Sequence, residues 1–203
     1  MGTGMEIIED CSPYYIRFTH DGINDLVDLC KSYVTPELLE NCKNKDFVNH
    51  KLPLDQAEKV LSLIPASNKI NFIKERVSLF VTKPGFYYRA HKDGPNHRFS
   101  LNYTIIVMDD KCITSWYSDD ILNDYTLDLT HKDSRECLGF VKESHTPIKS
   151  MIAKPNEAIL FNTEIFHDWD NTNSENYRVV LTLRSQNPGR VYFDDVKKIL
   201  LGN

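Results

Sequence analysis

Two histidines, one aspartate and one arginine have the types and the spacing that metal chemistry would need. His91 and Asp93 are two residues apart, and His167 lies far downstream, eleven residues before Arg178. Two imidazoles and one carboxylate can bind a divalent iron on one face and leave the opposite face open. An arginine on a neighbouring strand can bind a carboxylate of a second molecule through two parallel hydrogen bonds.

The spacing of His91 and Asp93 suits a strand end, because residues i and i+2 of a strand point to the same side. The turn residues Gly94, Pro95 and Asn96 follow at once and are expected to end this strand. Both side chains could then reach one ion at the mouth of a barrel. An isolated H-x-D pattern is weak evidence, because it often occurs by chance.

The spacing of His167 and Arg178 suggests a hairpin. Their midpoint falls in Thr172-Asn173, inside the turn-rich segment DNTNSEN. We therefore expect the two residues to lie opposite each other on paired antiparallel strands, with Cβ atoms about 5 Å apart. This arrangement would place the guanidinium about one small diacid's length from the metal.

The tripeptide of His91 to Asp93 occurs a second time, at His131-Lys132-Asp133. Its neighbours are polar on both sides and no apolar strand leads into it, so a solvated turn is the preferred interpretation. His97 and His145 are expected to be loop histidines without a partner at a suitable spacing. Metal binding is therefore assigned to His91, Asp93 and His167.

The elements that would position these residues change in type along the chain. Residues 1–67 read as helical, with amphipathic stripes at 23–30 and 54–63 and a helix start at Thr35-Pro36. From about residue 68, branched and aromatic residues with turn signals predict short antiparallel strands. Residues 119–135 are polar and read as an insertion or a long hairpin, and 193–203 form a predicted C-terminal helix.

This order predicts an α+β protein that is mainly β. We expect a single domain over 1–203, in which 68–192 form a double-stranded β-helix (a jelly roll, cupin-like) backed by the N-terminal helices. Such a barrel can enclose a small ligand between its two sheets.

The composition of the chain argues against several classes of function. The formal net charge of −5 gives no basic footprint, which argues against nucleic-acid binding. The five cysteines are odd in number and contain no CxxC pair, which argues against a disulfide framework and a structural zinc site. No apolar run reaches the length of a membrane span and no signal peptide is visible. A cytoplasmic location is therefore expected.

The set H-x-D…H…R, on short strands after a helical part, resembles the Fe(II)/2-oxoglutarate-dependent oxygenase superfamily over about residues 68–185. The segment HKDGPNHRFSLN resembles its aspartyl/asparaginyl β-hydroxylase-like branch, with prolyl hydroxylase-like proteins and small phage and bacterial members as relatives. Aspartyl hydroxylases often lack a carboxylate at the second ligand position, whereas this chain keeps Asp93.

The resemblance implies roles for four residues. His91, Asp93 and His167 would bind Fe(II), and Arg178 would bind the C5 carboxylate of 2-oxoglutarate. Arg184 shares the strand face of Arg178 but lies six residues on, about 20 Å at the usual rise, so Arg178 is preferred. The implied reaction uses O2, hydroxylates a substrate and releases succinate and CO2, with ascorbate as a candidate reductant.

Alternation along residues 98–104 adds two further candidates. The even positions are polar and the odd positions are apolar. We expect Arg98 and Asn102 to point into the barrel and contact the co-substrate. The alternative is that this polar face meets water, as in many antiparallel sheets.

The substrate is left open between a small molecule and a peptide or protein. Two other function classes fit the same residues. One is a cupin-like metal enzyme that does not use 2-oxoglutarate, which would not need Arg178. The other is a non-enzymatic jelly-roll binding module.

Overall fold

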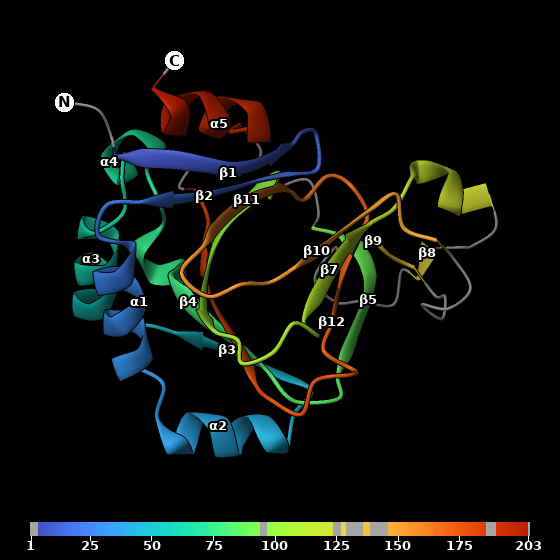
Figure 1. Cartoon of the computed structure of the whole chain (residues 1–203), viewed down its shortest axis with the longest axis horizontal. Coiled ribbons are helices and arrows are strands. Elements are labelled where there is room, and N and C mark those ends of the chain that lie inside the picture. The colour runs from blue at the N-terminus through green and yellow to red at the C-terminus, as the bar shows by residue number, and fades with distance from the viewer. Residues whose placement is uncertain are drawn as a thin grey trace.

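The computed structural model describes residues 4–93, 97–123, 127–128, 136–138, 146–185 and 190–202. Two antiparallel sheets face each other, and helices lie along the outer side of the larger sheet (Figure 1). The protein is therefore of mixed α+β type, as the order of sequence patterns predicted. No helix in the described part of the chain is long and apolar enough to cross a membrane.

The larger sheet has seven strands. In spatial order they are β1 (Met5–Cys11), β2 (Tyr15–His20), β11 (Ala158–Asn162), β6 (Phe99–Ile106), β13 (Arg178–Leu183), β4 (Ser78–Thr82) and β3 (Phe47–Lys51). The smaller sheet has the order β10 (Lys149–Ile152), β7 (Ile113–Trp116), β12 (His167–Asp170), β5 (Tyr87–Lys92), β9 (Glu136–Leu138) and β8 (Leu127–Asp128). Successive strands from β4 to β7, and again from β10 to β13, alternate between the two sheets.

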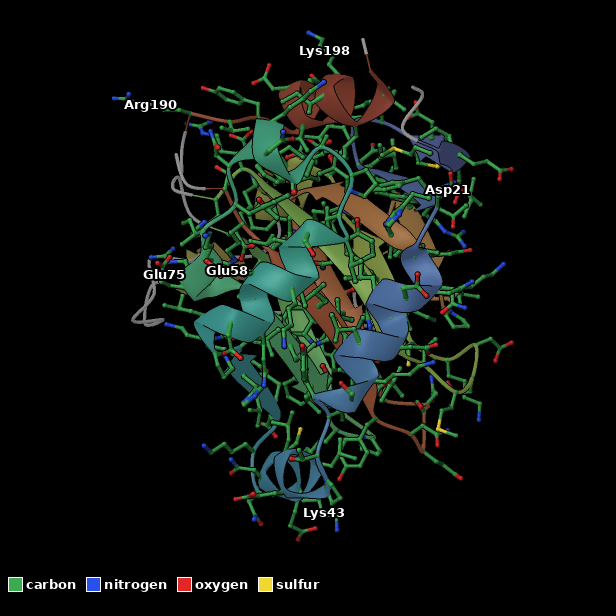
Figure 2. All side chains as sticks on the ribbon, turned by 90° about the vertical axis from the view of Figure 1, so that its left-hand side faces the viewer. Asp21, Lys43, Glu58, Glu75, Arg190 and Lys198 are labelled. Atoms are coloured by element: carbon green, nitrogen blue, oxygen red, sulfur yellow. The ribbon has the colours of Figure 1, made fainter. Side chains whose placement is uncertain are left out.

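The helices are α1 (Ile23–Ser32), α2 (Pro36–Lys43), α3 (Leu54–Ser62), α4 (Ser67–Ile70) and α5 (Phe193–Leu201), with 3-10 turns at Lys74–Arg76 and Asp119–Asn123. Helices α1 and α3 lie side by side, and their charged residues, such as Glu58, point to solvent (Figure 2). The start of α2 is as predicted, because Thr35 is its N-cap and accepts a hydrogen bond from the Leu38 backbone N–H at 3.1 Å.

The main hydrophobic core lies between these helices and the outer face of the larger sheet. Leu26 and Cys30 of α1 are fully buried there together with Leu101 and Tyr103 of β6. The odd residues of β6 therefore face the helices. Because side chains alternate along a strand, Ser100 and Asn102 face the space between the two sheets.

The N-terminal part is not wholly helical, so the prediction for residues 1–67 was incomplete. It contributes β1, β2 and β3, which extend the larger sheet at its two edges. Their sequences lack the clear alternation of apolar and polar residues that predicts a strand. In β1, for example, the adjacent residues Ile7 and Ile8 are both exposed, at 38% and 45%. Each of the three strands pairs with another strand of the sheet: β1 with β2, β2 also with β11 far away in the sequence, and β3 with β4.

The predicted hairpin between His167 and Arg178 is wrong. Strand β12 pairs with β5 and β7 in the smaller sheet, whereas β13 pairs with β4 and β6 in the larger one. The link between them, residues 171–177, is longer than a tight hairpin loop and carries the chain from one sheet to the other. His167 and Arg178 therefore do not pair across a ladder, and they project from different sheets.

Candidate metal centre

The predicted triad comes together at one end of the smaller sheet. His91 lies near the end of β5, Asp93 follows that strand, and His167 begins β12. All three side chains are buried, and one potential ligand atom from each lies within 4.8 Å of the others. This spacing allows the three residues to bind a single ion.

The ladder between β5 and β12 aligns the two histidines. His91 and His167 are Cα partners, and their ring centroids are 4.5 Å apart. Nδ1 of His91 lies 3.0 Å from the carbonyl oxygen of Arg89, and Nδ1 of His167 lies 2.8 Å from that of Ile165. A carbonyl oxygen only accepts, so each Nδ1 carries the proton. Nε2 is then the ring nitrogen of each histidine that would bind a metal.

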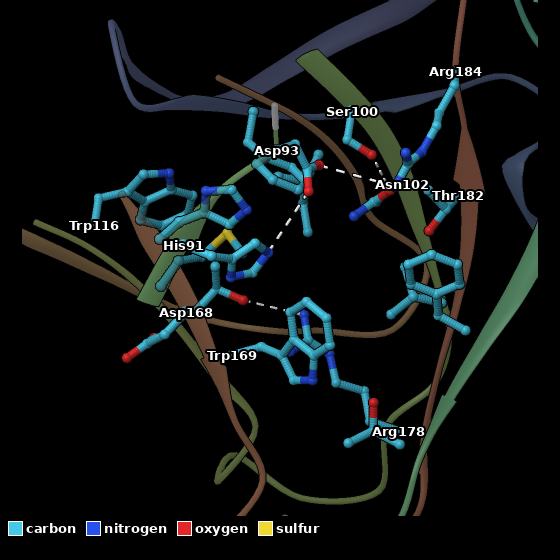
Figure 3. A pocket seen from close by; sticks show the side chains of 18 residues that line it. His91, Asp93, Ser100, Asn102, Trp116, Asp168, Trp169, Arg178, Thr182 and Arg184 are labelled. Carbon is cyan, nitrogen blue, oxygen red and sulfur yellow. Dashed lines mark hydrogen bonds and ion pairs between the residues drawn. The ribbon is translucent and has the colours of Figure 1, made fainter. Parts of the chain in front are cut away.

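Asp93 completes the triad from just beyond the strand end. Its Oδ1 lies 3.7 Å from Nε2 of His91, and its Oδ2 lies 3.9 Å from a guanidinium nitrogen of Arg184 (Figure 3). Its backbone N–H donates to the carbonyl oxygen of Thr163 at 3.1 Å. One carboxylate oxygen therefore faces a histidine of the triad while the other faces a cation.

The triad opens into a cavity between the two sheets, with about 720 Å³ of empty space, part of which is open to solvent. One wall comes from the larger sheet and includes Asn102, Ile159 and Val180. The opposite wall comes from the smaller sheet and includes the histidines and Trp116. The cavity therefore gives the triad a space, bounded by both sheets, into which a small ligand could enter.

Arg178 lies in the same cavity, on a different side from Arg184 (Figure 3). It is buried, and one terminal nitrogen donates to Oγ1 of Thr114 at 3.2 Å. Its Nε has no hydrogen-bond partner among the described residues, and no described carboxylate forms an ion pair with it. Burial lowers the pKa of Arg178 from its ordinary value, although the more distant charge of Asp168 opposes this shift.

Three further buried polar atoms of the cavity wall have no partner in the part of the chain that the structure describes. They are the indole Nε1 atoms of Trp116 and Trp169 and the Oγ1 of Thr182. Buried donors are normally satisfied, because an unpaired one costs about 1–3 kcal/mol. Together with Arg178, they indicate that the cavity is built for a polar, hydrogen-bond-accepting ligand.

Of the two candidates from the alternating segment, Asn102 and Arg98, only Asn102 lies in the cavity. Asn102 lines the cavity, where its Oδ1 accepts from Ser100 at 2.8 Å. Arg98 does not line the cavity. Its guanidinium pairs with Glu164 at 2.5 Å and lies over the ring of Tyr192, so the prediction that it points into the barrel is wrong. Strand β6 begins only at Phe99, and the alternation therefore does not extend back to Arg98.

Arg184 was predicted to be too far away for the ligand that Arg178 would bind, and its position beside Asp93 was not foreseen. That prediction used only the six-residue separation of Arg184 from Arg178 along the strand. The long side chain instead reaches along the strand direction to the carboxylate of the triad. The signal that the sequence did offer was the position of Arg184 on the same strand face as Arg178.

A buried carboxylate next to His167 was also missed. Asp168 accepts hydrogen bonds from the hydroxyl groups of Tyr117 at 2.6 Å and Tyr87 at 3.0 Å, and from the backbone N–H of Ser115 at 3.0 Å. Burial and the adjacent negative charge of Asp168 raise the pKa values of both tyrosines. The network ties β12 to its two neighbouring strands, β5 and β7.

The remaining candidate histidines do not join the triad. Nε2 of His97 lies 3.3 Å from a guanidinium nitrogen of Arg76, at an exposed position. The predicted turn at His131-Lys132-Asp133 and the loop histidine His145 lie outside the described residues.

The sequence matches no protein-family model and no curated protein. Among solved structures, the fold is similar to that of the epimerase SnoN in complex with Fe3+, alpha-ketoglutarate and nogalamycin RO. That match has 8% identity and a TM-score of 0.48, and covers 87% of this chain and 82% of SnoN. A weaker match is Peruvianin-I, a cysteine peptidase from Thevetia peruviana latex, with 16% identity, a TM-score of 0.32 and coverage of 56% and 52%. Both TM-scores are below 0.5, so the function of this chain has to be inferred from its own side chains.

Proposed function

We propose that the protein is an Fe(II)- and 2-oxoglutarate-dependent oxygenase that hydroxylates a substrate. One observation supports this above all others. A buried His–Asp–His triad and a buried guanidinium without a carboxylate partner in the described part of the chain line the same cavity. The triad suits a redox-active divalent metal, and the guanidinium suits one end of an anionic co-substrate.

The donor set fits iron in its divalent state. His91 and His167 offer Nε2 atoms and Asp93 offers one oxygen, which leaves part of the coordination sphere for other ligands. When bound, iron, 2-oxoglutarate and O2 supply the oxidising chemistry, and the keto acid leaves as succinate and CO2. The chain itself would contribute the ligand atoms, the orientation of the two imidazoles and the walls of the cavity.

Arg178 would bind the C5 carboxylate of 2-oxoglutarate. A buried cation is costly without a counter-charge, and a carboxylate would supply both the charge and the acceptor that Nε lacks. Thr114 holds one terminal nitrogen from the opposite sheet, which orients the plane of the guanidinium. This combination supports a carboxylate site at that end of the cavity.

The order of the strands supports the same assignment. Strands β4 to β7 and β10 to β13 wind alternately through the two sheets, the pattern of a double-stranded β-helix. In that arrangement the metal-binding residues come from the smaller sheet, and the wall facing them comes from the larger one. The jelly-roll fold therefore belongs to this proposal.

The primary substrate would occupy the part of the cavity away from Arg178. Asn102 and Thr182 offer hydrogen-bonding groups there, and Ile159 and Phe161 offer apolar surface. This mixed wall suits a small polar molecule or a side chain of a peptide or protein. Binding of nucleic acid or of a membrane forms no part of the proposal, and a cytoplasmic location remains a prediction.

The test is binding and turnover with purified protein. Anaerobic addition of Fe(II) and then 2-oxoglutarate should produce a visible metal-to-ligand charge-transfer band. Addition of O2 and ascorbate should then release succinate slowly even without a primary substrate. Both signals should disappear in Asp93→Ala, while His97→Ala serves as the matched control and should keep both.

The alternatives give different results in the same experiment. Metal binding without keto-acid binding would contradict the proposal and favour a cupin-like enzyme that does not use 2-oxoglutarate. Failure of the anaerobic protein to bind either molecule would favour a non-enzymatic binding module.

A further inference from the structure

The two histidines and the aspartate of the triad are held in different ways. His91 and His167 face each other in a ladder, and a backbone carbonyl accepts from Nδ1 of each ring. Asp93 lies beyond the end of β5, where its backbone N–H donates to the carbonyl oxygen of Thr163 and not to a strand of the ladder. The terminal torsion of a carboxylate is also soft, so its two oxygens can exchange places easily.

Arg184 lies beside one of these two oxygens. Its guanidinium lies 3.9 Å from Oδ2 of Asp93, and the two side chains are 14% and 9% exposed. Oδ1 of the same carboxylate lies 3.7 Å from Nε2 of His91. The two oxygens of Asp93 thus have different neighbours, a cation on one side and a triad histidine on the other (Figure 3).

We infer that Arg184 is a positioning residue for Asp93. Its guanidinium holds Oδ2, so that Oδ1 stays on the side of the histidines as the oxygen available to a metal. This inference rests on the proposed metal site, but it does not depend on the identity of the co-substrate. Groups that orient a metal ligand in this way change metal affinity, typically by 10- to 100-fold.

A competing electrostatic effect would change metal affinity in the opposite direction. The sign of the change in metal affinity when Arg184 is replaced therefore tests the inference. A guanidinium near a metal site repels the incoming cation and withdraws charge from the carboxylate. If only this electrostatic effect mattered, removal of Arg184 would tighten metal binding. If orientation of Asp93 matters more, removal of Arg184 will weaken it.

The same strand provides the control. Arg178 and Arg184 are both on or just after β13, six residues apart, which is about 20 Å along an extended strand. Both line the cavity, but only Arg184 forms an ion pair with Asp93 among the described residues. Replacement of either arginine removes one positive charge from the cavity. Comparison of the metal affinities of the two variants therefore separates the positioning of Asp93 from the general electrostatic effect.

The experiment is an anaerobic titration with Co(II) or Fe(II) in the absence of 2-oxoglutarate. Arg184→Met should weaken metal binding by roughly 10- to 100-fold, and Arg184→Lys should recover part of that loss because it keeps a charged donor. Arg178→Met should bind metal as the wild type does. At saturation, the visible spectrum of Co(II) in Arg184→Met should differ from that of the wild type, since a freed carboxylate changes the coordination geometry.

Several outcomes would overturn the inference. Unchanged or tighter metal binding in Arg184→Met would do so, and so would an equal loss in Arg178→Met. If Arg184→Met does not fold, a crystal structure of the metal-loaded wild type decides the matter. Asp93 bound through one oxygen, with Arg184 on the other, would support positioning, and binding through both oxygens would exclude it. A wild type that binds no metal would instead remove the proposed function, and this inference with it.

Discussion

His91 and His167 are direct partners across the ladder between β5 and β12, with ring centroids 4.5 Å apart. The pairing brings together two residues that are distant in the sequence. Because both Nδ1 atoms lie against carbonyl oxygens, Nε2 is the nitrogen of each ring that would bind a metal. The fold itself therefore sets the geometry of the candidate metal site.

Removal of any member of the triad should abolish metal binding at micromolar concentrations. His167→Ala leaves only one imidazole and one carboxylate, too few to hold a divalent ion against water. Titration with Co(II), followed by absorption or calorimetry, measures the loss. His97→Ala is the control and should bind normally, because His97 contacts Arg76 outside the triad. Full binding in His167→Ala would place the metal elsewhere.

Arg178→Met should raise the dissociation constant for 2-oxoglutarate by one to three orders of magnitude. A buried, charge-assisted hydrogen bond is worth ~2–4 kcal/mol, and methionine fills similar volume without a donor. Binding of the keto acid to the metal-loaded protein, measured by the charge-transfer band, reports the change. An unaltered dissociation constant would remove Arg178 from this role.

The same substitution should stabilise the protein when no ligand is present. Burial of a guanidinium without a carboxylate partner is unfavourable, which is why the pKa of Arg178 is lowered, and an apolar replacement removes that cost. Replacement of buried charges by apolar residues has gained about 1–4 kcal/mol in other proteins. Urea unfolding of the metal-free protein should show a gain in this direction. A loss of stability in Arg178→Met would indicate a partner for Arg178 in the folded protein.

The sequence predicted the residues of the candidate metal site better than it predicted the pairing of the strands that carry them. A period of two at a strand end was sufficient to place His91 and Asp93 together, because this rule depends only on local geometry. The predicted hairpin of His167 and Arg178 relied on the same kind of local argument and was wrong. The partners of β12 and β13 are strands that lie far away in the sequence, and local spacing carries no information about them.

The misplacement of the arginines has a similar cause. Arg98 was assigned by extending the alternation of β6 one residue beyond its start, where an ion pair with Glu164 decides the direction of the side chain. Arg184 was judged by its Cα position on the strand, although the length of an arginine side chain allows it to reach Asp93. Side-chain direction at strand ends depends on tertiary partners, which a sequence alone does not identify.

Arg98→Met and Asn102→Ala should therefore behave differently. Arg98 lies outside the cavity, so its replacement should leave the dissociation constant for 2-oxoglutarate within twofold of the wild type and cost at most about 1 kcal/mol of stability. Asn102 lines the cavity, and Asn102→Ala should weaken binding of 2-oxoglutarate or of the substrate, or lower turnover. Calorimetric titration of both variants with 2-oxoglutarate compares them. A large loss in Arg98→Met would restore the role predicted from the sequence.

Stability should also fall in mildly acidic solution because of His20. Its Nδ1 lies 2.7 Å from the carbonyl oxygen of Asp21, its ring packs edge-on against Tyr103, and its buried Nε2 has no hydrogen-bond partner among the described residues. Burial lowers the pKa of His20, so the folded state favours the neutral ring. As the pH falls below the ordinary histidine value of about 6.5, the unfolded chain takes up a proton that the folded protein resists. The stabilisation is therefore present above that pH and is lost as the pH falls through the lowered pKa.

Substitution of His20 isolates this contribution from those of the other histidines. His20→Phe keeps an aromatic ring against Tyr103 but cannot take up a proton. Urea unfolding at pH 7.5 and pH 5.5 should show that the wild type loses of the order of 1 kcal/mol more than the variant between the two conditions. Equal losses would mean that His20 titrates in the same way in the folded and unfolded states, contrary to its burial in the folded protein.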